Sequence, residues 1–150
     1  MIIFPRAMIQ IYRKTRSPIW LTNAKKRLQD MKLWNEQGVS WNFHHKQQLM
    51  EAEEHYSSGN LDLAKESYKN AIDSSRRSKF VNDEALANEL AGRFYLETGD
   101  LESSLEHFRL AHNNYSDWGA IGKAVHLYEC TTNTFASYFS NRHDGQGGGS

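Results

Sequence analysis

The spacing of apolar and polar residues predicts helices along almost the whole chain. An early stripe, Leu28, Met31 and Trp34, repeats every third residue and predicts a helix over residues 22–36. From residue 42 to about residue 139 the spacing is helical almost throughout. Both prolines lie within the first eighteen residues, so the strongest helix breaker is absent from the remainder. The pattern therefore predicts an all-α fold.

Composition divides the chain into three parts. They are a basic N-terminal segment, a helical repeat domain and a flexible Gly-rich tail, at residues 1–20, 21–140 and 141–150. Ser17-Pro18 predicts a break in the chain, after which Thr22 or Asn23 would cap the first helix of the domain.

A repeat of forty residues lies within the helical region. When residues 50–75 are aligned with residues 90–115, six positions correspond in residue type. The six pairs are Ala52 and Gly92, Gly59 and Gly99, Leu61 and Leu101, Glu66 and Glu106, Tyr68 and Phe108, and Ala71 and Ala111. Each unit is therefore predicted to be a helix, a tight turn and a second, antiparallel helix.

The recurring residues suit two closely packed helices. A glycine can adopt positive φ where the first helix ends, and Asn60 or Asp100 can cap the second helix. A small residue such as Gly92 lets the helices approach closely, and an aromatic such as Phe108 fills the remaining space. These residues resemble the tetratricopeptide repeat. The resemblance implies an antiparallel helix-pair solenoid with a leading helix and a C-terminal capping helix.

The forty-residue period is longer than the ~34 residues usual for that repeat. The segment Ser74–Asp83 is therefore expected to extend the helices or to add a loop. Ser116 or Asp117 is expected to begin the capping helix, in which Phe135 continues the register of Tyr95. The array would then hold two full repeats between the leading and capping helices.

A narrower resemblance is to the repeat region of very large multidomain signalling ATPases. In that family a Ser/Thr-kinase-like domain and an AAA-type ATPase domain precede the repeats, and GAF, PAS and histidine-kinase domains often follow. The residues that carry the resemblance are Trp34, Asn42, Phe43, His45, Lys46 and the blocks 51–53, 85–95 and 115–122. The sequence contains neither a GxxxxGK[S/T] loop nor a kinase signature, so the resemblance extends only to the non-catalytic connector.

The resemblance implies a protein–protein interaction scaffold in signal transduction, without enzymatic activity, cofactor or metal. One alternative is a non-catalytic regulatory fragment of a multidomain ATPase or histidine kinase. Another is a membrane- or organelle-associated adaptor that uses the basic N-terminus. No nucleic-acid partner is expected.

The repeat family also implies a binding site, because the first helix of each pair lines a concave groove. Carried onto this sequence, the groove residues are Lys46, Leu49, Glu53, Tyr56, Leu86, Glu89, Arg93, Leu96, His126, Glu129 and Asn133. Their mixed charge and apolar surface suit an extended or helical peptide. Glu53 and Arg93 are expected to lie on faces that need not be buried. The alternative is that the chain's own N-terminal helix fills the groove.

Charge is segregated along the chain although the net charge is zero. Residues 1–29 carry seven bases and no acid, whereas the remaining residues hold all eighteen acids and eleven bases. This segment could be an organelle-targeting peptide, a membrane-surface patch or the solvated start of the domain. Residues 1–20 are expected to be dispensable for folding. The single cysteine, Cys130, is expected to be packed as a small apolar residue in a reducing, cytoplasmic location.

Overall fold

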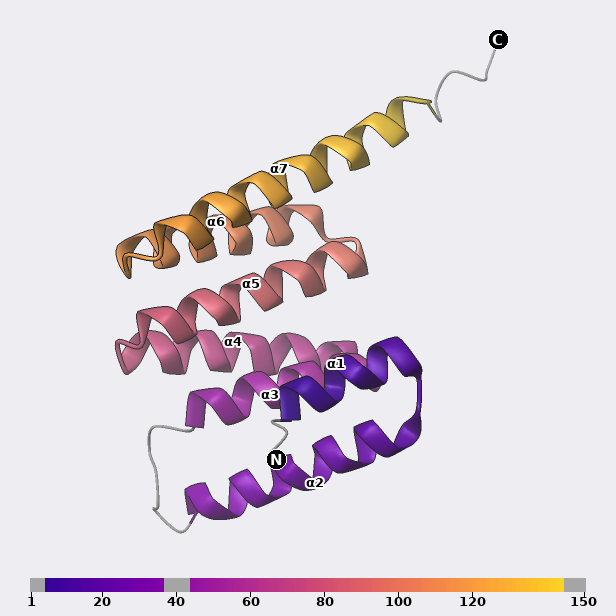
Figure 1. The fold of residues 1–150 in the computed structure, drawn as a ribbon, viewed down its shortest axis with the longest axis vertical. Coiled ribbons are helices and arrows are strands. Elements are labelled where there is room, and N and C mark those ends of the chain that lie inside the picture. Colours follow the sequence, from indigo (N-terminus) through magenta and orange to yellow (C-terminus); the bar gives the residue numbers. More distant parts are fainter. Residues whose placement is uncertain (1–4, 37–43, 145–150) are drawn as a thin grey trace.

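The computed structural model describes residues 5–36 and 44–144. Within these ranges the chain forms seven helices and no strand, so the prediction of an all-α fold is confirmed (Figure 1). The helices are α1 Pro5–Thr15, α2 Pro18–Glu36, α3 His44–Ser57, α4 Leu61–Arg77, α5 Val81–Thr98, α6 Leu101–Asp117 and α7 Ile121–Asp144.

From α2 to α7 the helices are stacked in chain order. In Figure 1, α2 lies at one end of the stack, α7 lies at the other, and α3 to α6 lie between them. The packing is most extensive between α3 and α4 and between α5 and α6, and α4 joins these two pairs by packing on α5. The first helix, α1, packs against both α2 and α3. The N-terminal segment is thus part of the packed structure.

Four turns between the later helices share one geometry and recur every twenty residues. The residue with positive φ is Gly59 (84°), Lys79 (60°), Gly99 (92°) or Gly119 (91°). In each turn the next residue donates its backbone N–H to the carbonyl five residues earlier, as in Asp100 to Tyr95 at 2.9 Å. This pattern satisfies carbonyls that a helix end leaves open. The forty-residue repeat is therefore two helix-turn units of twenty residues each.

Several predicted helix ends are corrected by the structure. Helix α2 begins at Pro18, whose fixed φ suits the first turn of a helix. Thr22 lies inside this helix and donates its hydroxyl to the Pro18 carbonyl at 3.0 Å, so it is not a cap. Asp100 does cap α6, because its carboxylate accepts the Ser103 amide, whereas Asn60 makes no such bond.

The segment Ser74–Asp83 extends the helices, because α4 continues to Arg77 and α5 begins at Val81. Residues 116 and 117 end α6 and do not begin the next helix, which starts at Ile121. Helix α7 also continues to Asp144, so the first four residues of the predicted tail are helical.

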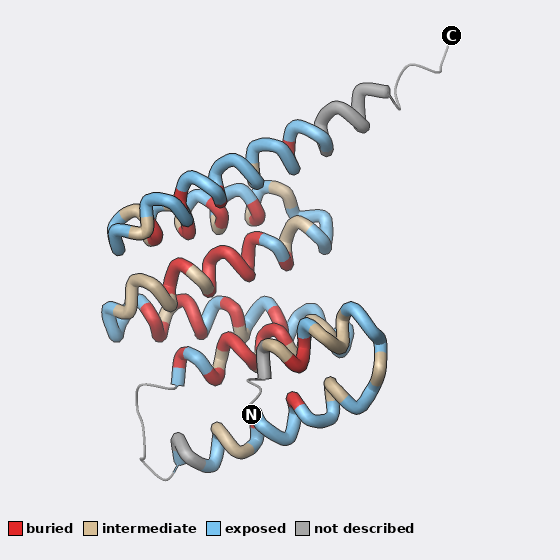
Figure 2. The backbone as a smooth tube through the Cα atoms, in the orientation of Figure 1, coloured by how far each residue is buried: buried red, intermediate tan, exposed pale blue. Residues whose placement is uncertain are grey.

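The core lies where the helices face one another, which Figure 2 shows as buried stretches along the inner sides of α3 to α6. Tyr68 and Phe108 are buried there, as their places in the repeat predict. At Gly92 a Cβ atom would lie 2.9 Å from the Phe108 ring, so this close crossing requires glycine. Phe135 is also buried and meets Phe108 edge-on, with ring centroids 6.5 Å apart.

Candidate functional site

The face of α3 holds a buried carboxylate, that of Glu53, whose side chain is 2% exposed. The Tyr68 hydroxyl of α4 donates a hydrogen bond to Glu53 Oε1, and the Arg13 guanidinium of α1 donates to Oε2 at 3.0 Å. Burial, together with the negative charge of Glu53, raises the pKa of Tyr68 well above 10.0. Tyr68 therefore remains a hydrogen-bond donor, and the carboxylate is compensated by groups from two other helices.

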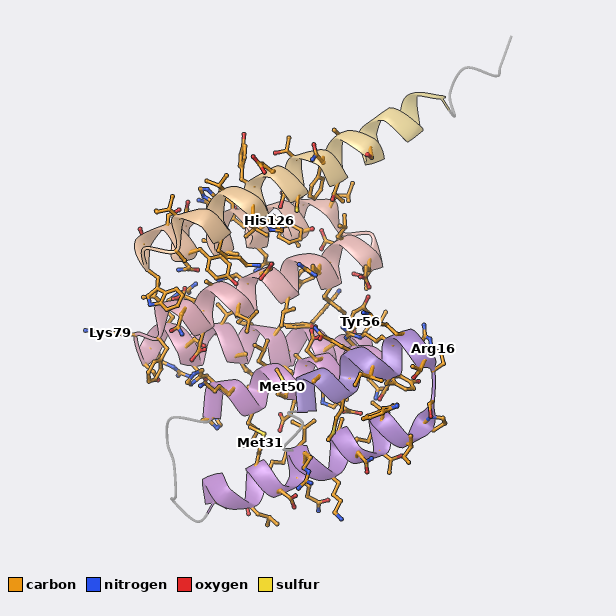
Figure 3. The ribbon with its side chains drawn as sticks, viewed as in Figure 1. Arg16, Met31, Met50, Tyr56, Lys79 and His126 are labelled. Carbon is orange, nitrogen blue, oxygen red and sulfur yellow. The ribbon has the colours of Figure 1, made fainter. Side chains whose placement is uncertain are left out.

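Arg13 makes further contacts that fix α1 on α3. It donates to the Ser57 hydroxyl at 2.8 Å and to the Glu53 backbone carbonyl at 3.2 Å. Its guanidinium carbon lies 4.5 Å from the centroid of the Tyr56 ring, a cation–π distance. Figure 3 labels Tyr56 next to α1. Two residues that were assigned to the groove, Glu53 and Tyr56, are thus in contact with the N-terminal helix.

The face of α5 holds a second buried carboxylate, that of Glu89. The Tyr115 hydroxyl of α6 donates to Glu89 Oε2 at 2.9 Å, and Lys123 Nζ of α7 lies 3.1 Å from Oε1. Arg93, one turn further along α5, lies 3.3 Å from the same Oε1. Burial raises the pKa of Glu89, but the hydrogen bonds from Lys123 and Tyr115 outweigh it and hold the pKa below its usual range.

The two buried carboxylates share one chemistry. Each is held by a tyrosine hydroxyl from the partner helix of its pair and by a cation from a helix outside that pair. They are not equivalent in the repeat, because an offset of forty aligns Glu53 with Arg93 and not with Glu89. Because the Glu53 side chain is 2% exposed, the expectation that it lies on a face that need not be buried is wrong.

The other residues assigned to the groove differ in exposure. Leu49 is buried in the core beside Leu28 of α2, while Leu86 and Leu96 are half-buried and pack against the core. The exposed members are Lys46, Arg93, His126, Glu129 and Asn133. The assigned residues thus divide into a part closed by packing and an exposed part, which comprises Lys46 at the start of α3 and the remaining exposed residues on α5 and α7.

Sequence reasoning missed Arg13 and Lys123, the two cations that reach the buried carboxylates. Arg13 belongs to the segment expected to be dispensable, and Lys123 is not among the residues assigned to the groove on the capping helix. Both contacts join residues more than thirty positions apart, at 40 for Arg13 and Glu53 and 34 for Lys123 and Glu89. A pattern read within one helix gives no signal for such contacts.

A cleft of about 530 Å³ lies between α4, α5 and α6. None of the assigned groove residues lines it. Its polar wall is internally bonded, since Oδ1 of the buried Asn88 accepts from His107 Nδ1 at 3.0 Å and its Nδ2 donates to Asn114 Oδ1 at 3.2 Å. Burial lowers the pKa of His107. The other residues that line the cleft are Asp62, Lys65, Glu66, Tyr68, Lys69, Ile72, Asp73, Arg76, Tyr95 and Leu110.

The remaining chemistry is limited to individual side chains. Cys130 is exposed on α7, which corrects the expectation of a packed residue, and its Sγ lies 3.6 Å from His126 Nε2. Among the described residues, no three histidine, cysteine or acidic side chains come together as a metal site would require. None of the described helices is long and apolar enough to cross a membrane.

The chain was also compared with known proteins. Comparison with protein-family models, with curated proteins and with solved structures gives no match.

Proposed function

We propose that the chain is a protein–protein interaction scaffold built from tetratricopeptide-like antiparallel helix pairs, α3–α4 and α5–α6. The recurrence of Gly59 and Gly99 in the turns, and of Ala52 and Gly92 at the helix crossings, supports this architecture. The proposed ligand is a peptide segment that lies on the faces of α3, α5 and α7. A role in signal transduction rests on the sequence resemblance alone.

The contact between α1 and α3 carries the proposal. There a helical segment lies on the face of a first helix, and its Arg13 is held between the Glu53 carboxylate and the Tyr56 ring. This contact is a short-range example of the helix-on-face recognition that we assign to the scaffold. The first pair is occupied in this way by the chain itself.

The part left for a partner is the continuation of this face over α5 and α7. Arg93 is 61% exposed there, and Leu86 and Leu96 on the same helix are half-buried. On α7, His126 lies one turn beyond Lys123, which reaches Glu89 on α5, so this side of α7 borders the same face. A peptide with a carboxylate for Arg93 and an apolar side chain for Leu86 or Leu96 fits this surface.

A charge reversal with a matched control tests the proposal. The full chain is used to select binders from a displayed library of random peptides, and their Kd is measured by calorimetry for the wild type, Arg93→Glu and Arg109→Glu. Arg109 is 59% exposed and is also paired with a nearby glutamate, but it lies on α6. We expect Arg93→Glu to weaken binding by ~1–3 kcal/mol and Arg109→Glu to leave it unchanged.

Two results would contradict the proposal. One is a selection that yields no peptide with saturable binding. The other is binding that weakens equally in the Arg93 and Arg109 variants, because this would reflect net charge and not the face of α5.

The basic N-terminus has a structural use that weakens the adaptor alternative. Arg13 is bound to Glu53, Lys25 lies 3.2 Å from Glu54, and Arg27 lies 3.7 Å from Asp30. These ion pairs reduce the positive charge that α1 and α2 could offer to an anionic surface.

A further inference from the structure

The guanidinium group of Arg13 is bound by α3 through each of its three nitrogens. Nη1 donates to Glu53 Oε2 at 3.0 Å, Nη2 donates to the Glu53 backbone carbonyl at 3.2 Å, and Nε donates to the Ser57 hydroxyl at 2.8 Å. The Tyr56 ring lies against the same group, with 4.5 Å between the ring centroid and the guanidinium carbon. A planar cation with several donors suits this set better than an ammonium does. This surface of α3, Glu53 to Ser57, is called the guanidinium site below.

The guanidinium site is held in place without help from α1. The Tyr68 hydroxyl of α4 donates to Glu53 Oε1, the carboxylate oxygen that Arg13 Nη1 does not contact. The Tyr56 ring meets the buried Phe94 ring of α5 edge-on, with centroids 5.1 Å apart. The helix pairs therefore orient both the carboxylate and the ring, and α1 contributes the cation.

The apolar side of α1 packs away from the main core. Met8 and Ile9 are buried with Ala24 of α2 in a small cluster, against which Trp20 also packs. The main core cluster takes its residues from α2, α3, α4 and α5, and it includes none of those described from α1. Helix α1 is thus not part of the core on which the two helix pairs rest.

The connection between α1 and α2 is short and strained. It consists of Arg16 and Ser17, and Arg16 adopts a φ of 57°. This left-handed region disfavours residues that carry a side chain. Movement of α1 away from α3 would let Arg16 return to an ordinary conformation, so the connection does not favour the closed arrangement.

The second pair shows that the repeat fold does not need such a site. An offset of forty aligns Glu53, Tyr56 and Ser57 with Arg93, Leu96 and Glu97. A cation and an aliphatic chain replace the buried carboxylate and the ring, so a guanidinium could not bind there in the same way. A buried ion pair is also seldom the most stable filling of a position. The site is therefore better explained by recognition than by folding.

We propose that the guanidinium site binds an arginine-bearing helix of a partner protein, and that α1 occupies it as an internal ligand which the partner displaces. This inference rests on the proposed scaffold function, which it extends from the open face of α5 to the closed face of α3. The ligand resembles α1, in which an aliphatic residue, Ile9, precedes Arg13 by four positions and acidic residues are absent. Binding is weakened in the free chain, because the partner must replace the contacts of α1.

Removal of the Arg13 side chain opens the site to a small cation. The full-length Arg13→Ala variant lacks the atoms that ethylguanidinium supplies, so this cation at millimolar concentration should bind saturably and raise the melting temperature of the variant. Ethylurea has nearly the same shape but no charge, and it should have no effect. The wild type, whose site is filled, should respond to neither compound. Thermal unfolding followed by circular dichroism measures the shifts.

Two further variants locate the effect. Combining Arg13→Ala with Glu53→Gln removes the charge of the site and should abolish the response to ethylguanidinium. Arg93→Ala is the matched control, because Arg93 is also paired with a buried glutamate but is 61% exposed, so its removal opens no enclosed site. If ethylguanidinium and ethylurea act alike on Arg13→Ala, the site does not recognise a guanidinium and the inference is overturned.

Displacement of α1 is measured with a labelled peptide of residues 5–15, acetylated and amidated at its ends. Fluorescence anisotropy should show that it binds the full-length Arg13→Ala variant roughly tenfold or more tightly than the wild type, in which α1 competes at high effective concentration. The same peptide with lysine in place of Arg13 should bind both proteins more weakly.

Equal affinity of the arginine peptide for the two proteins, or a lack of saturable binding, would overturn the displacement of α1. The comparison of the arginine and lysine peptides on the wild type does not require the Arg13→Ala chain to fold, and equal affinities there also overturn the inference. Neither experiment depends on Arg93, so the guanidinium site and the peptide-binding face of α5 can fail separately.

Discussion

The two helix pairs of this chain place their buried carboxylates in different surroundings. In the first pair Glu53 is bound by Arg13 of α1, whose side chain is 30% exposed. In the second pair Glu89 is bound by Lys123 and Arg93, which are 41% and 61% exposed. The first face is closed by the chain's own N-terminal helix and the second is open to solvent. The same kind of buried carboxylate is therefore held by a largely buried cation in one pair and by more exposed cations in the next.

The largest expected effect comes from a large side chain placed where α5 and α6, the helices of the second pair, cross at Gly92. Gly92→Leu should destabilise the chain by more than ~3 kcal/mol, because a Cβ atom alone would lie 2.9 Å from the buried Phe108 ring and added methylenes increase the overpacking. Thermal and urea unfolding followed by circular dichroism measure the change.

Gly122→Leu on α7 is the matched control for this substitution. No atom lies within 4 Å of the Cβ position at Gly122, so leucine should be neutral or should stabilise the helix by up to ~1 kcal/mol. Equal destabilisation by the two variants would mean that the crossing at Phe108 does not set the effect, because helix propensity favours leucine over glycine at both positions.

Removal of each carboxylate should separate the two faces. Glu53→Ala leaves Arg13 and the buried Tyr68 hydroxyl without their partner, and it should destabilise the fold by ~2–4 kcal/mol. Glu89→Ala should destabilise it by less, ~1–2 kcal/mol, because Lys123 and Arg93 can return to water. Urea denaturation of both variants gives the comparison, and a larger effect at Glu89 would contradict it.

The contact of α1 gives the same comparison a second test. Deleting residues 1–17 removes Arg13 together with the buried Met8 and Ile9, and the shortened chain should melt at a lower temperature. A lower melting temperature would contradict the expectation that the basic segment is dispensable for folding. A melting temperature equal to that of the full chain would support that expectation.

The features that sequence predicted are those that depend on neighbours within one repeat. The turn glycines, the crossing at Gly92 and the burial of Phe108 follow from residue size and backbone freedom, which recur with the repeat. The contacts of Arg13 and Lys123 could not be predicted, because they depend on how helices from different parts of the chain are placed. The break predicted at Ser17-Pro18 is confirmed, since α1 ends at Thr15 and α2 begins at Pro18, whereas the predicted cap at Thr22 or Asn23 is wrong because the fixed φ of Pro18 suits the first turn of the helix.

Acid should affect the second face through Glu89. Its pKa is lowered in the folded chain, so the ionised carboxylate stabilises the fold above the ordinary value of 4.5, and this contribution is lost as the pH falls through the folded pKa. Glu89→Gln removes this contribution, so the variant should lose less stability than the wild type on acidification from pH 6. Glu97→Gln, at an exposed carboxyl on the same helix, is the control. Urea denaturation at several pH values measures it, and equal slopes for the wild type and the Glu89 variant would contradict the assignment.

The smallest expected effect concerns the turn that joins the two pairs. Lys79 adopts a φ of 60° at the position where Gly59, Gly99 and Gly119 stand in the other turns. A side chain in the left-handed region costs about 1 kcal/mol, which glycine avoids. Figure 3 shows Lys79 at the edge of the stack, pointing away from it, so its side chain adds little packing in return.

Lys79→Gly should therefore stabilise the chain by ~0.5–1 kcal/mol, after glycine's greater freedom in the unfolded state has offset part of the gain. Gly99→Ala places a side chain at the same φ and should destabilise by a similar amount, although nothing lies within 4 Å of its Cβ position. Opposite signs for the two substitutions, measured by urea denaturation, would show that backbone conformation alone distinguishes the turns. If Lys79→Gly destabilised the chain, the lysine side chain would be contributing contacts that link the first pair to the second.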